Sequence, residues 1–164
     1  MDEHLVPIRF RLNGQQHTVQ VPPQELLIDL IRDRLGLTGT KRSCDMEICG
    51  SCTVLINGKA TSSCSIFAFD VDGKDVLTIE GLAPEEGLHP IQEAFLECGG
   101  FQCGFCTPGI LMSLDTLLAT EPRANAERIR DVLSGHLCRC TGYQPIVAAA
   151  LDAAQTLREE TDNA

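Results

Sequence analysis

The sequence has no tryptophan and one tyrosine, and only 4% of its 164 residues are aromatic, so we expect a core of leucine, isoleucine, valine and alanine. No segment approaches the roughly 20 apolar residues of a membrane-spanning helix, so we expect no membrane span. Basic residues are few, with 13 Lys and Arg against 23 Asp and Glu and a net charge of −10, which argues against nucleic-acid binding. The start, "MDEHLVPIRF", lacks the pattern of a secretory signal, so we expect a cytoplasmic protein.

Cysteine, by contrast, is abundant, with nine copies. In a reducing compartment this abundance favours metal ligands over disulfides. Eight of the nine fall into two groups of four. The first group has the spacing C-x4-C-x2-C-x11-C and consists of Cys44, Cys49, Cys52 and Cys64. The second group has C-x2-C followed by C-x-C and consists of Cys103, Cys106, Cys138 and Cys140.

Four thiolates can hold either a [2Fe–2S] cluster or a tetrahedral zinc ion. The C-x4-C-x2-C spacing of the first group is typical of plant-type ferredoxins and favours iron. The small residues Gly50 and Ser51 between its cysteines would let backbone N–H groups approach inorganic sulfide. The C-x2-C of the second group is less specific. Zinc at both groups, a redox dithiol in "CGFC" and disulfides therefore stay open at this point.

The first half of the chain has the patterns of a small sheet with one helix. Residues 6–12 alternate apolar and polar, and Asn13-Gly14 is a typical hairpin turn before a second alternating run. The segment "PPQELLIDLIRDRLG" (22–36) has a helical apolar stripe. Two further strands are expected, "TVLING" after the cysteine loop and "DVLTIEG" over 75–81. This order predicts a mixed sheet packed on one helix.

From about residue 84 the apolar period changes to that of helices, which we expect over roughly 90–98, 108–119, 126–134 and 145–158. Asn125 is a candidate N-cap, and Thr107-Pro108 reads as an N-cap followed by proline. Both cysteine pairs of the second group would then precede helix N-termini, whose positive dipole ends favour an anionic cluster. Cys98 is expected to be a buried free thiol on an apolar helix face.

Four segments carry a resemblance to a known family. They are "CGSCTV" (49–54), "LHPIQEAF" (88–95), "QCGFCTPG" (102–109) and "GHLCRCTGY" (135–143). Together they resemble the small iron–sulfur subunit of the molybdenum hydroxylases, the group of xanthine, aldehyde, carbon monoxide, quinoline and nicotine dehydrogenases. The resemblance covers residues 5–155, nearly the whole chain.

The resemblance implies an α+β protein. A plant-ferredoxin-like β-grasp domain over residues 1–81 would precede a four-helix domain over residues 82–164. Each domain would hold one [2Fe–2S] cluster through its own group of four cysteines. The chain would not be catalytic alone, and it contains no nucleotide-binding glycine motif of its own.

The resemblance also implies two partners, a large molybdopterin-binding subunit and a medium FAD-binding subunit, in a heterotrimer or its dimer. Electrons would pass from the molybdopterin centre through the C-terminal cluster and then the N-terminal cluster to FAD. Gln102 and Cys140 match positions that face the pterin in the family. The runner-up function is a free-standing ferredoxin-type electron carrier, although a carrier needs only the first cluster. A zinc-stapled interaction module is a third.

The first cysteine loop departs from the family at two positions. Ser43 and Glu47 stand where the family usually has glycine, which would alter contacts that depend on positive φ. We expect the carboxylate of Glu47 to lower the potential of the N-terminal cluster. The neighbouring Lys41-Arg42 pair is either a solvated pair, a contact for the flavin subunit, or partial compensation of cluster charge.

Overall fold

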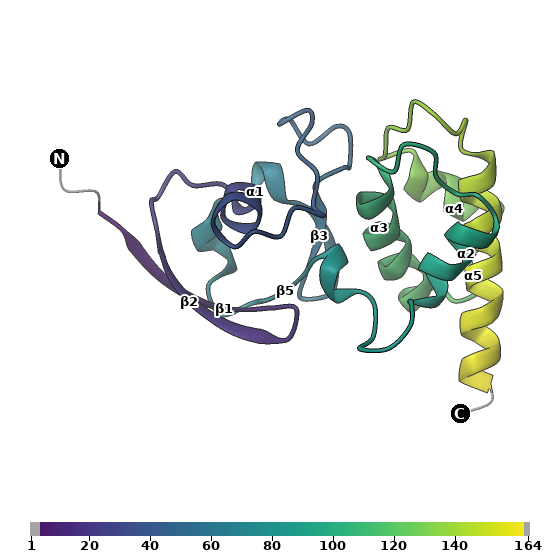
Figure 1. Ribbon diagram of the computed structural model, residues 1–164, viewed down its shortest axis with the longest axis horizontal. Coiled ribbons are helices and arrows are strands. Elements are labelled where there is room, and N and C mark those ends of the chain that lie inside the picture. The colour runs from purple at the N-terminus through teal and green to yellow at the C-terminus, as the bar shows by residue number, and fades with distance from the viewer. Residues whose placement is uncertain (1–3, 163–164) are drawn as a thin grey trace.

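The computed structural model describes residues 4–162 and contains a five-stranded mixed sheet and five α-helices (Figure 1). The strands are β1 (Val6–Leu12), β2 (Gln15–Val21), β3 (Thr53–Ile56), β4 (Lys59–Ser62) and β5 (Asp75–Leu77). The helices are α1 (Leu27–Asp29), α2 (Pro90–Glu97), α3 (Thr107–Thr120), α4 (Ala126–Leu133) and α5 (Gln144–Asp162). The sheet comes first in the chain and four of the helices follow, which confirms the predicted α+β class.

The first hairpin forms as predicted. β1 and β2 pair antiparallel from Val6 opposite Val21 to Leu12 opposite Gln15. The turn residues Asn13 and Gly14 have φ values of 50° and 79°, the left-handed conformation that a two-residue hairpin requires.

The helix predicted after Pro22 and Pro23 and before Gly36 is shorter in the structure. Its α-helical part, α1, continues directly into a π-helical segment, η1 (Leu30–Arg34). Leu26 stays outside because its backbone forms a bridge with Phe67 instead. Three of the four buried residues of this segment, Leu27, Leu30 and Ile31, pack in one core with the inward side chains of β1, while the fourth, Ile28, packs with Cys52 and Cys64.

β5 is the middle strand of the sheet, whose order is β2-β1-β5-β3-β4, and it pairs parallel with β1 and antiparallel with β3. The strand predicted over 75–81 ends early, at Leu77. The reason is a contact with the first hairpin: the Asn13 side chain accepts a hydrogen bond from the Thr78 N–H at 2.9 Å, and a 3-10 helix, η4 (Ile79–Gly81), follows.

The four C-terminal helices lie within a few residues of the predicted ranges. Asn125 caps α4 as predicted, because its side chain accepts a hydrogen bond from the Arg128 N–H at 2.9 Å. Thr107 as an N-cap is wrong: Cys106 holds that position and Thr107 is the first helical residue. Cys98 is half-buried rather than buried, since it is the C-cap at the end of α2.

Two hydrophobic cores meet at β3. Val54 belongs to the core under the sheet, whereas the next residue, Leu55, packs into the core of the helical half. Successive strand residues point to opposite faces, so one strand serves both cores. α3 packs directly against β3, and α2 packs against α5 (Figure 1). The proposed division of the chain between residues 81 and 82 stays a prediction.

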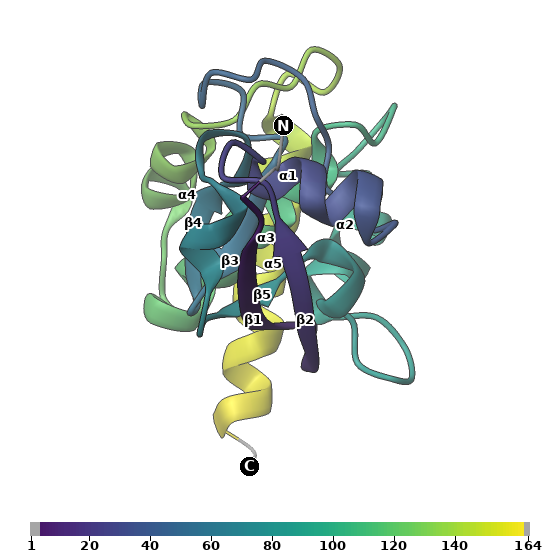
Figure 2. The same cartoon turned by 90° about the vertical axis from the view of Figure 1, so that its left-hand side faces the viewer.

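Within residues 4–162, no helix combines the length and the apolar character needed to span a bilayer. The connections that carry the cysteines gather at one end of the molecule, the top of both Figures 1 and 2.

Candidate iron–sulfur centres

The first group of cysteines is assembled by a loop and a hairpin. Cys44, Cys49 and Cys52 lie between η1 and β3, and Cys64 lies in a 3-10 helix, η2 (Ser63–Ser65), directly after β4. The β3–β4 pairing brings the fourth cysteine back to the other three. Ser63 anchors this return, because its N–H and hydroxyl both donate to the Cys52 carbonyl oxygen, at 3.3 and 2.7 Å.

The loop curls around Cys44 through unusual backbone angles. Asp45, Glu47 and Gly50 have φ values of 53°, 60° and 69°. This curl turns backbone N–H groups inward, and the Cys49 N–H lies 3.4 Å from the Cys44 sulfur. The loop is therefore shaped as a cradle of N–H donors around a sulfur atom.

Electrostatics within the first group differ from one thiol to another. The backbone N–H groups of Met46, Cys49 and Ile48 lower the pKa of Cys44 to about 6, which favours its thiolate. Burial raises the pKa of Cys52 to about 11. A thiolate at the buried Cys52 is stable when a metal cation binds it, since a bound metal reverses the effect of burial on the pKa.

The second group converges from two segments distant in sequence. Cys103 and Cys106 precede α3, while Cys138 and Cys140 precede α5. The sulfur atoms of Cys103 and Cys140 are 3.6 Å apart. Burial, together with the neighbouring thiol of Cys138, raises the pKa of Cys106 to about 12. The four thiols thus form one exposed pair, Cys103 with Cys140, and one more deeply placed pair, Cys106 with Cys138.

The arrangement in pairs fits a two-iron cluster. Each iron of a [2Fe–2S] cluster takes two protein ligands, so a donor set of two close thiol pairs matches it. In the first group, the Cys49 side chain acts on the Cys44 thiol, and the Cys64 side chain acts on the Cys52 thiol. Among residues 4–162, no group of three or more His, Cys, Asp or Glu side chains is arranged to hold a single metal ion.

Neither disulfides nor a redox dithiol fits the arrangement of the thiols. All nine cysteines are free, so the described chain contains no disulfide. A redox dithiol in "CGFC" would pair Cys103 with Cys106. Each of these instead faces a cysteine of the later C-x-C segment, and the pKa of Cys106 is raised rather than lowered.

The segments that carry the two cysteine groups are in direct contact. The Leu137 N–H donates to the Cys49 carbonyl oxygen at 3.0 Å. Glycines permit this approach: a Cβ at Gly50 would lie 2.3 Å from His136 Nδ1, and a Cβ at Gly109 would lie 2.1 Å from the Gly50 carbonyl oxygen. Neither the sequence pattern nor the spacing predicted this contact between the two halves.

Two side chains that the sequence reasoning missed hold the segment in contact. His136 is buried, its Nε2 lies 2.8 Å from the Ser113 hydroxyl, and burial lowers its pKa to about 4, so it is neutral at pH 7. The Tyr143 hydroxyl donates to the His136 carbonyl oxygen and accepts the Cys138 N–H, both at 2.9 Å. The only available signal was proximity to the cysteines within "GHLCRCTGY".

Gln102 and the exposed thiol pair share the outer side of the second group. Gln102, Cys103 and Cys140 are all exposed. Phe101 and Phe105 beside them are 38% and 45% exposed, large values for aromatic side chains. This side of the second group therefore offers accessible sulfur framed by apolar and amide groups.

Arg42, next to the first group, is already paired inside the chain. Its guanidinium contacts the carboxylates of Asp29 and Asp45. Lys41 donates from its ammonium to the Thr38 carbonyl oxygen at 2.8 Å. Arg42 therefore ties the loop to α1, and its local negative partners limit its compensation of cluster charge.

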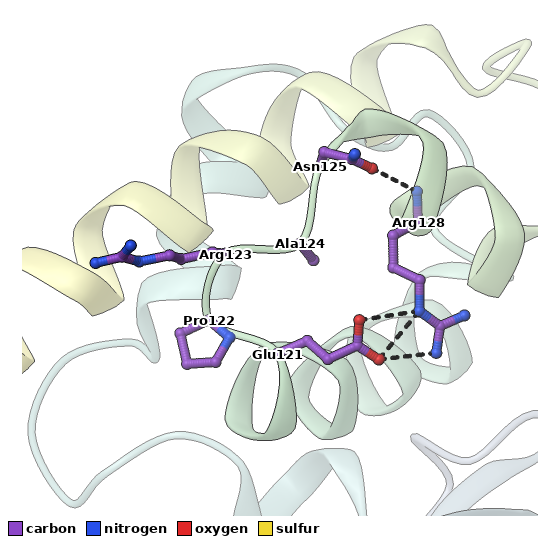
Figure 3. Close-up of a pocket in the computed structure, with 6 residues that line it drawn as sticks. All are labelled: Glu121, Pro122, Arg123, Ala124, Asn125 and Arg128. Carbon is purple, nitrogen blue, oxygen red and sulfur yellow. Dashed lines mark hydrogen bonds and ion pairs between the residues drawn. The ribbon is translucent and has the colours of Figure 1, made fainter.

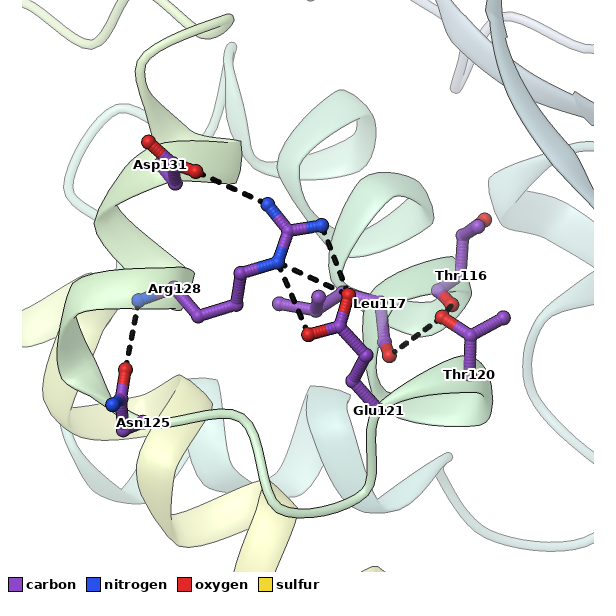
Figure 4. Close-up of polar contacts among 7 residues, drawn as sticks. All are labelled: Thr116, Leu117, Thr120, Glu121, Asn125, Arg128 and Asp131. Carbon is purple, nitrogen blue, oxygen red and sulfur yellow. Dashed lines mark hydrogen bonds and ion pairs between the residues drawn. The ribbon is translucent and has the colours of Figure 1, made fainter.

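A surface pocket at the connection between α3 and α4 lies away from the cysteines. Its lining comes from residues 121–125 and Arg128 (Figure 3). Glu121 accepts a forked hydrogen bond from Arg128, which also pairs with Asp131 (Figure 4). This end of α3 is separated from Cys106 by a helix of 14 residues, about 20 Å at the usual rise per residue. At this pocket the Glu121–Arg128 ion pair links the end of α3 to α4.

Comparison with known proteins agrees with this geometry. Residues 10–83 match the model of the 2Fe-2S iron-sulfur cluster binding domain, and residues 78–151 match that of the [2Fe-2S] binding domain. The 6-hydroxypseudooxynicotine dehydrogenase complex subunit beta of Paenarthrobacter nicotinovorans is 44% identical over 89% of this chain and 92% of its own. The caffeine dehydrogenase subunit gamma of Pseudomonas sp. (strain CBB1) is 40% identical over 95% and 94%.

Solved structures show the same likeness. A chain of quinoline 2-oxidoreductase from Pseudomonas putida 86 superposes with a TM-score of 0.90 at 39% identity, covering 94% of this chain and 97% of that one. Aldehyde oxidoreductase from Desulfovibrio gigas also gives 0.90, but there the match covers only 17% of a longer chain. The protein belongs to the family of small [2Fe–2S] iron–sulfur subunits of the molybdenum hydroxylases.

Proposed function

We propose that this chain is the electron-transfer subunit of a heteromeric molybdenum hydroxylase, with one [2Fe–2S] cluster in each cysteine group. The ligands of the N-terminal cluster are Cys44, Cys49, Cys52 and Cys64. The ligands of the C-terminal cluster are Cys103, Cys106, Cys138 and Cys140. The observation that carries the proposal is the hydrogen bond from the Leu137 N–H to the Cys49 carbonyl oxygen, which joins the segments that carry the two groups and supports two redox sites in series.

Bound clusters supply one-electron chemistry, and the residues of this chain set where and at what potential it takes place. The curled first loop offers N–H groups to Cys44 and thereby stabilises negative charge on sulfur. Burial of Cys49, Cys52 and Cys64 keeps water away from the first site, and these side chains are 6%, 2% and 5% exposed. Neutral His136 fills the space beside Gly50 without adding charge between the two sites.

The partners follow from the family. We propose a large molybdopterin-binding subunit at the exposed thiol pair, with Gln102 and Cys140 facing the pterin, and a medium FAD-binding subunit near the N-terminal group. The exposure of Gln102 and Cys140 supports this orientation. The three chains would form a heterotrimer or its dimer. A cytoplasmic location suits thiolate ligands, which need a reducing compartment.

A free-standing electron carrier is the less suitable function. Such a carrier needs one cluster and an exposed docking edge, whereas here a second cysteine group and four helices are built against the first. The large exposed side chains Phe101 and Phe105 beside the second group are better explained by a permanent partner.

The experiment is to purify the chain in its native complex and to measure iron, acid-labile sulfide and EPR spectra after reduction. We expect about four irons and four sulfides per copy, two distinct [2Fe–2S] signals, and copurification of a molybdenum-containing and a flavin-containing chain. One signal alone, colourless zinc protein, or a particle with the mass of this chain alone would contradict the proposal.

A further inference from the structure

Tyr143 is held in a backbone conformation that tyrosine disfavours. Its φ is 67°, in the left-handed region where glycine is normally found. The preceding residue, Gly142, also has a positive φ of 64°. Strained residues of this kind persist where the surroundings require the particular side chain, and they cluster at functional sites. Tyr143 is also the only tyrosine in the chain.

The hydrogen bonds of its hydroxyl have a fixed direction. The His136 carbonyl oxygen can only accept, so the Tyr143 hydroxyl donates to it, at 2.9 Å. The oxygen lone pairs then accept the Cys138 N–H, also at 2.9 Å. The amide of Cys138 is therefore bound to Tyr143 and is withheld from any sulfur atom nearby.

Thr141 makes the opposite contribution in the same turn. Its hydroxyl oxygen accepts the Tyr143 N–H at 3.2 Å and lies 3.1 Å from the Cys138 sulfur. Because the oxygen is already an acceptor and a cluster-bound thiolate has no proton, the Thr141 hydroxyl donates to Cys138. One residue of the turn thus supplies a hydrogen bond to the sulfur, while another removes one.

We propose that Tyr143 is a positioning residue that sets the reduction potential of the C-terminal cluster by withholding the Cys138 amide from the sulfur atoms. Hydrogen bonds to cluster or ligand sulfur stabilise the reduced, more negative state and raise the potential. With Tyr143 in place the Cys138 amide contributes no such bond, so the potential stays lower. The inference rests on the proposed function, because it assumes a cluster at Cys138.

The test compares Tyr143→Phe with Thr141→Val in the native complex, by redox titration with each cluster followed through its own EPR signal. In Tyr143→Phe the freed Cys138 N–H turns to sulfur or to water, and both raise the potential. At the potential that half-reduces the parent cluster, the variant cluster should be more than half reduced. In Thr141→Val the C-terminal cluster should be less than half reduced at the same potential, since the Cys138 sulfur loses the O–H donor of Thr141.

The opposite signs separate this role from a structural one. General loosening of the turn would shift the potential of the C-terminal cluster in the same direction in both variants. It would also lower the melting temperature, and it would not shift the potential of one cluster alone. The N-terminal cluster should keep its parent potential in both variants. As a matched control, Thr156→Val removes a hydroxyl that binds the Asp152 carbonyl oxygen within α5, and it should shift neither potential.

The proposal is overturned if Tyr143→Phe leaves the C-terminal potential unchanged, if the two variants shift in the same direction, or if both clusters shift equally. Should Tyr143→Phe lose its iron, 3-fluorotyrosine at position 143 keeps the hydroxyl as a weaker acceptor. A smaller upward shift then supports the proposal, and no shift overturns it. A parent complex without two [2Fe–2S] signals would refute the proposed function instead.

Discussion

Glu47 lies in the first cysteine loop with its backbone in the left-handed region, at a φ of 60°. A side chain with a Cβ is disfavoured there, whereas glycine adopts this conformation freely. The loop keeps its course around Cys44 with this side chain present, since the Cys49 N–H reaches the Cys44 sulfur.

Replacing Glu47 with glycine should therefore stabilise the protein by about 1 kcal/mol, because the left-handed conformation no longer strains the residue. Chemical denaturation of the iron-loaded protein measures this change. Glu47→Gln is the matched control: it keeps the Cβ and should gain little. Equal stability of the glycine variant and the parent would show that the loop carries no strain at this residue.

The charge of Glu47 has a separate consequence for the N-terminal cluster. A carboxylate near a cluster disfavours the added electron, so both Glu47→Gly and Glu47→Gln should raise the midpoint potential. An EPR-monitored titration measures the shift. An unchanged potential in both variants would remove Glu47 from the factors that set it.

At the scale of residues, the spacing of the cysteines could be read from the sequence, whereas contacts between distant side chains could not. The short spacings C-x4-C-x2-C, C-x2-C and C-x-C could be read because each is local in sequence, and the resemblance joined the two distant pairs of the second group. The positions of His136 and Tyr143 could not be read, since each depends on a hydrogen bond formed only after the segments fold together. Thr107 was predicted as the N-cap because threonine is common at that position. In the structure Thr107 is the first residue of α3, and its buried hydroxyl has no hydrogen-bond partner.

At the scale of elements, the start of α3 is pressed against the first cysteine loop. A Cβ at Gly109 would meet the Gly50 carbonyl oxygen at 2.1 Å and the Ser51 Cα at 3.1 Å, and backbone atoms cannot rotate aside. Gly109→Ala should lower the free energy of unfolding by about 1–3 kcal/mol, as overpacking typically does. It should also weaken the binding of both clusters.

Gly135→Ala is a suitable control for this change. A Cβ at Gly135 has only one neighbour, the Val132 carbonyl oxygen at an ordinary 3.5 Å. Melting temperature and iron content should therefore fall in Gly109→Ala and stay near the parent in Gly135→Ala. Similar losses in both variants would mean that the close approach of α3 to the loop is not what matters.

The cap of α4 gives a second prediction for a single element. Asn125→Ala removes the acceptor for the Arg128 N–H and should destabilise the protein by about 1 kcal/mol, whereas Asn125→Gly should cost only a few tenths. Both clusters should keep their EPR signals, because the pocket of Figure 3 lies at the far end of α3. Loss of a cluster signal would show that this end is coupled to the cysteines.

The helices were predictable as elements because apolar residues recur along each of them with the period of a helix. The sheet was less so. Its hairpin followed from Asn13-Gly14, but the early end of β5 follows from the Asn13 side chain binding Thr78, a contact across 65 positions of sequence. The π-helical η1 likewise has no signature in the apolar pattern, which fits an α-helix equally well.

At the scale of the whole molecule, each cysteine group has its own core behind it. Cys106 packs in the core of the helical half, while Cys52 and Cys64 belong to a small cluster with Ile28 in the other half. Cys106→Ser should therefore abolish the EPR signal of the C-terminal cluster and keep that of the N-terminal one. Cys98→Ser, outside both groups, should keep both signals, and loss of both signals in Cys106→Ser would contradict separate sites.

The dual burial of β3 bears on how the spacing of the two centres is maintained. Because Val54 and Leu55 are wedged into opposite cores, the separation depends on the thickness of one strand with its side chains. The exposed turn at Glu85, Glu86 and Gly87, which joins the halves along the chain, has no part in it. A change in the length of that turn should then leave electron tunnelling unaffected. A single-residue deletion in β3 would instead move its side chains to the opposite face of the sheet.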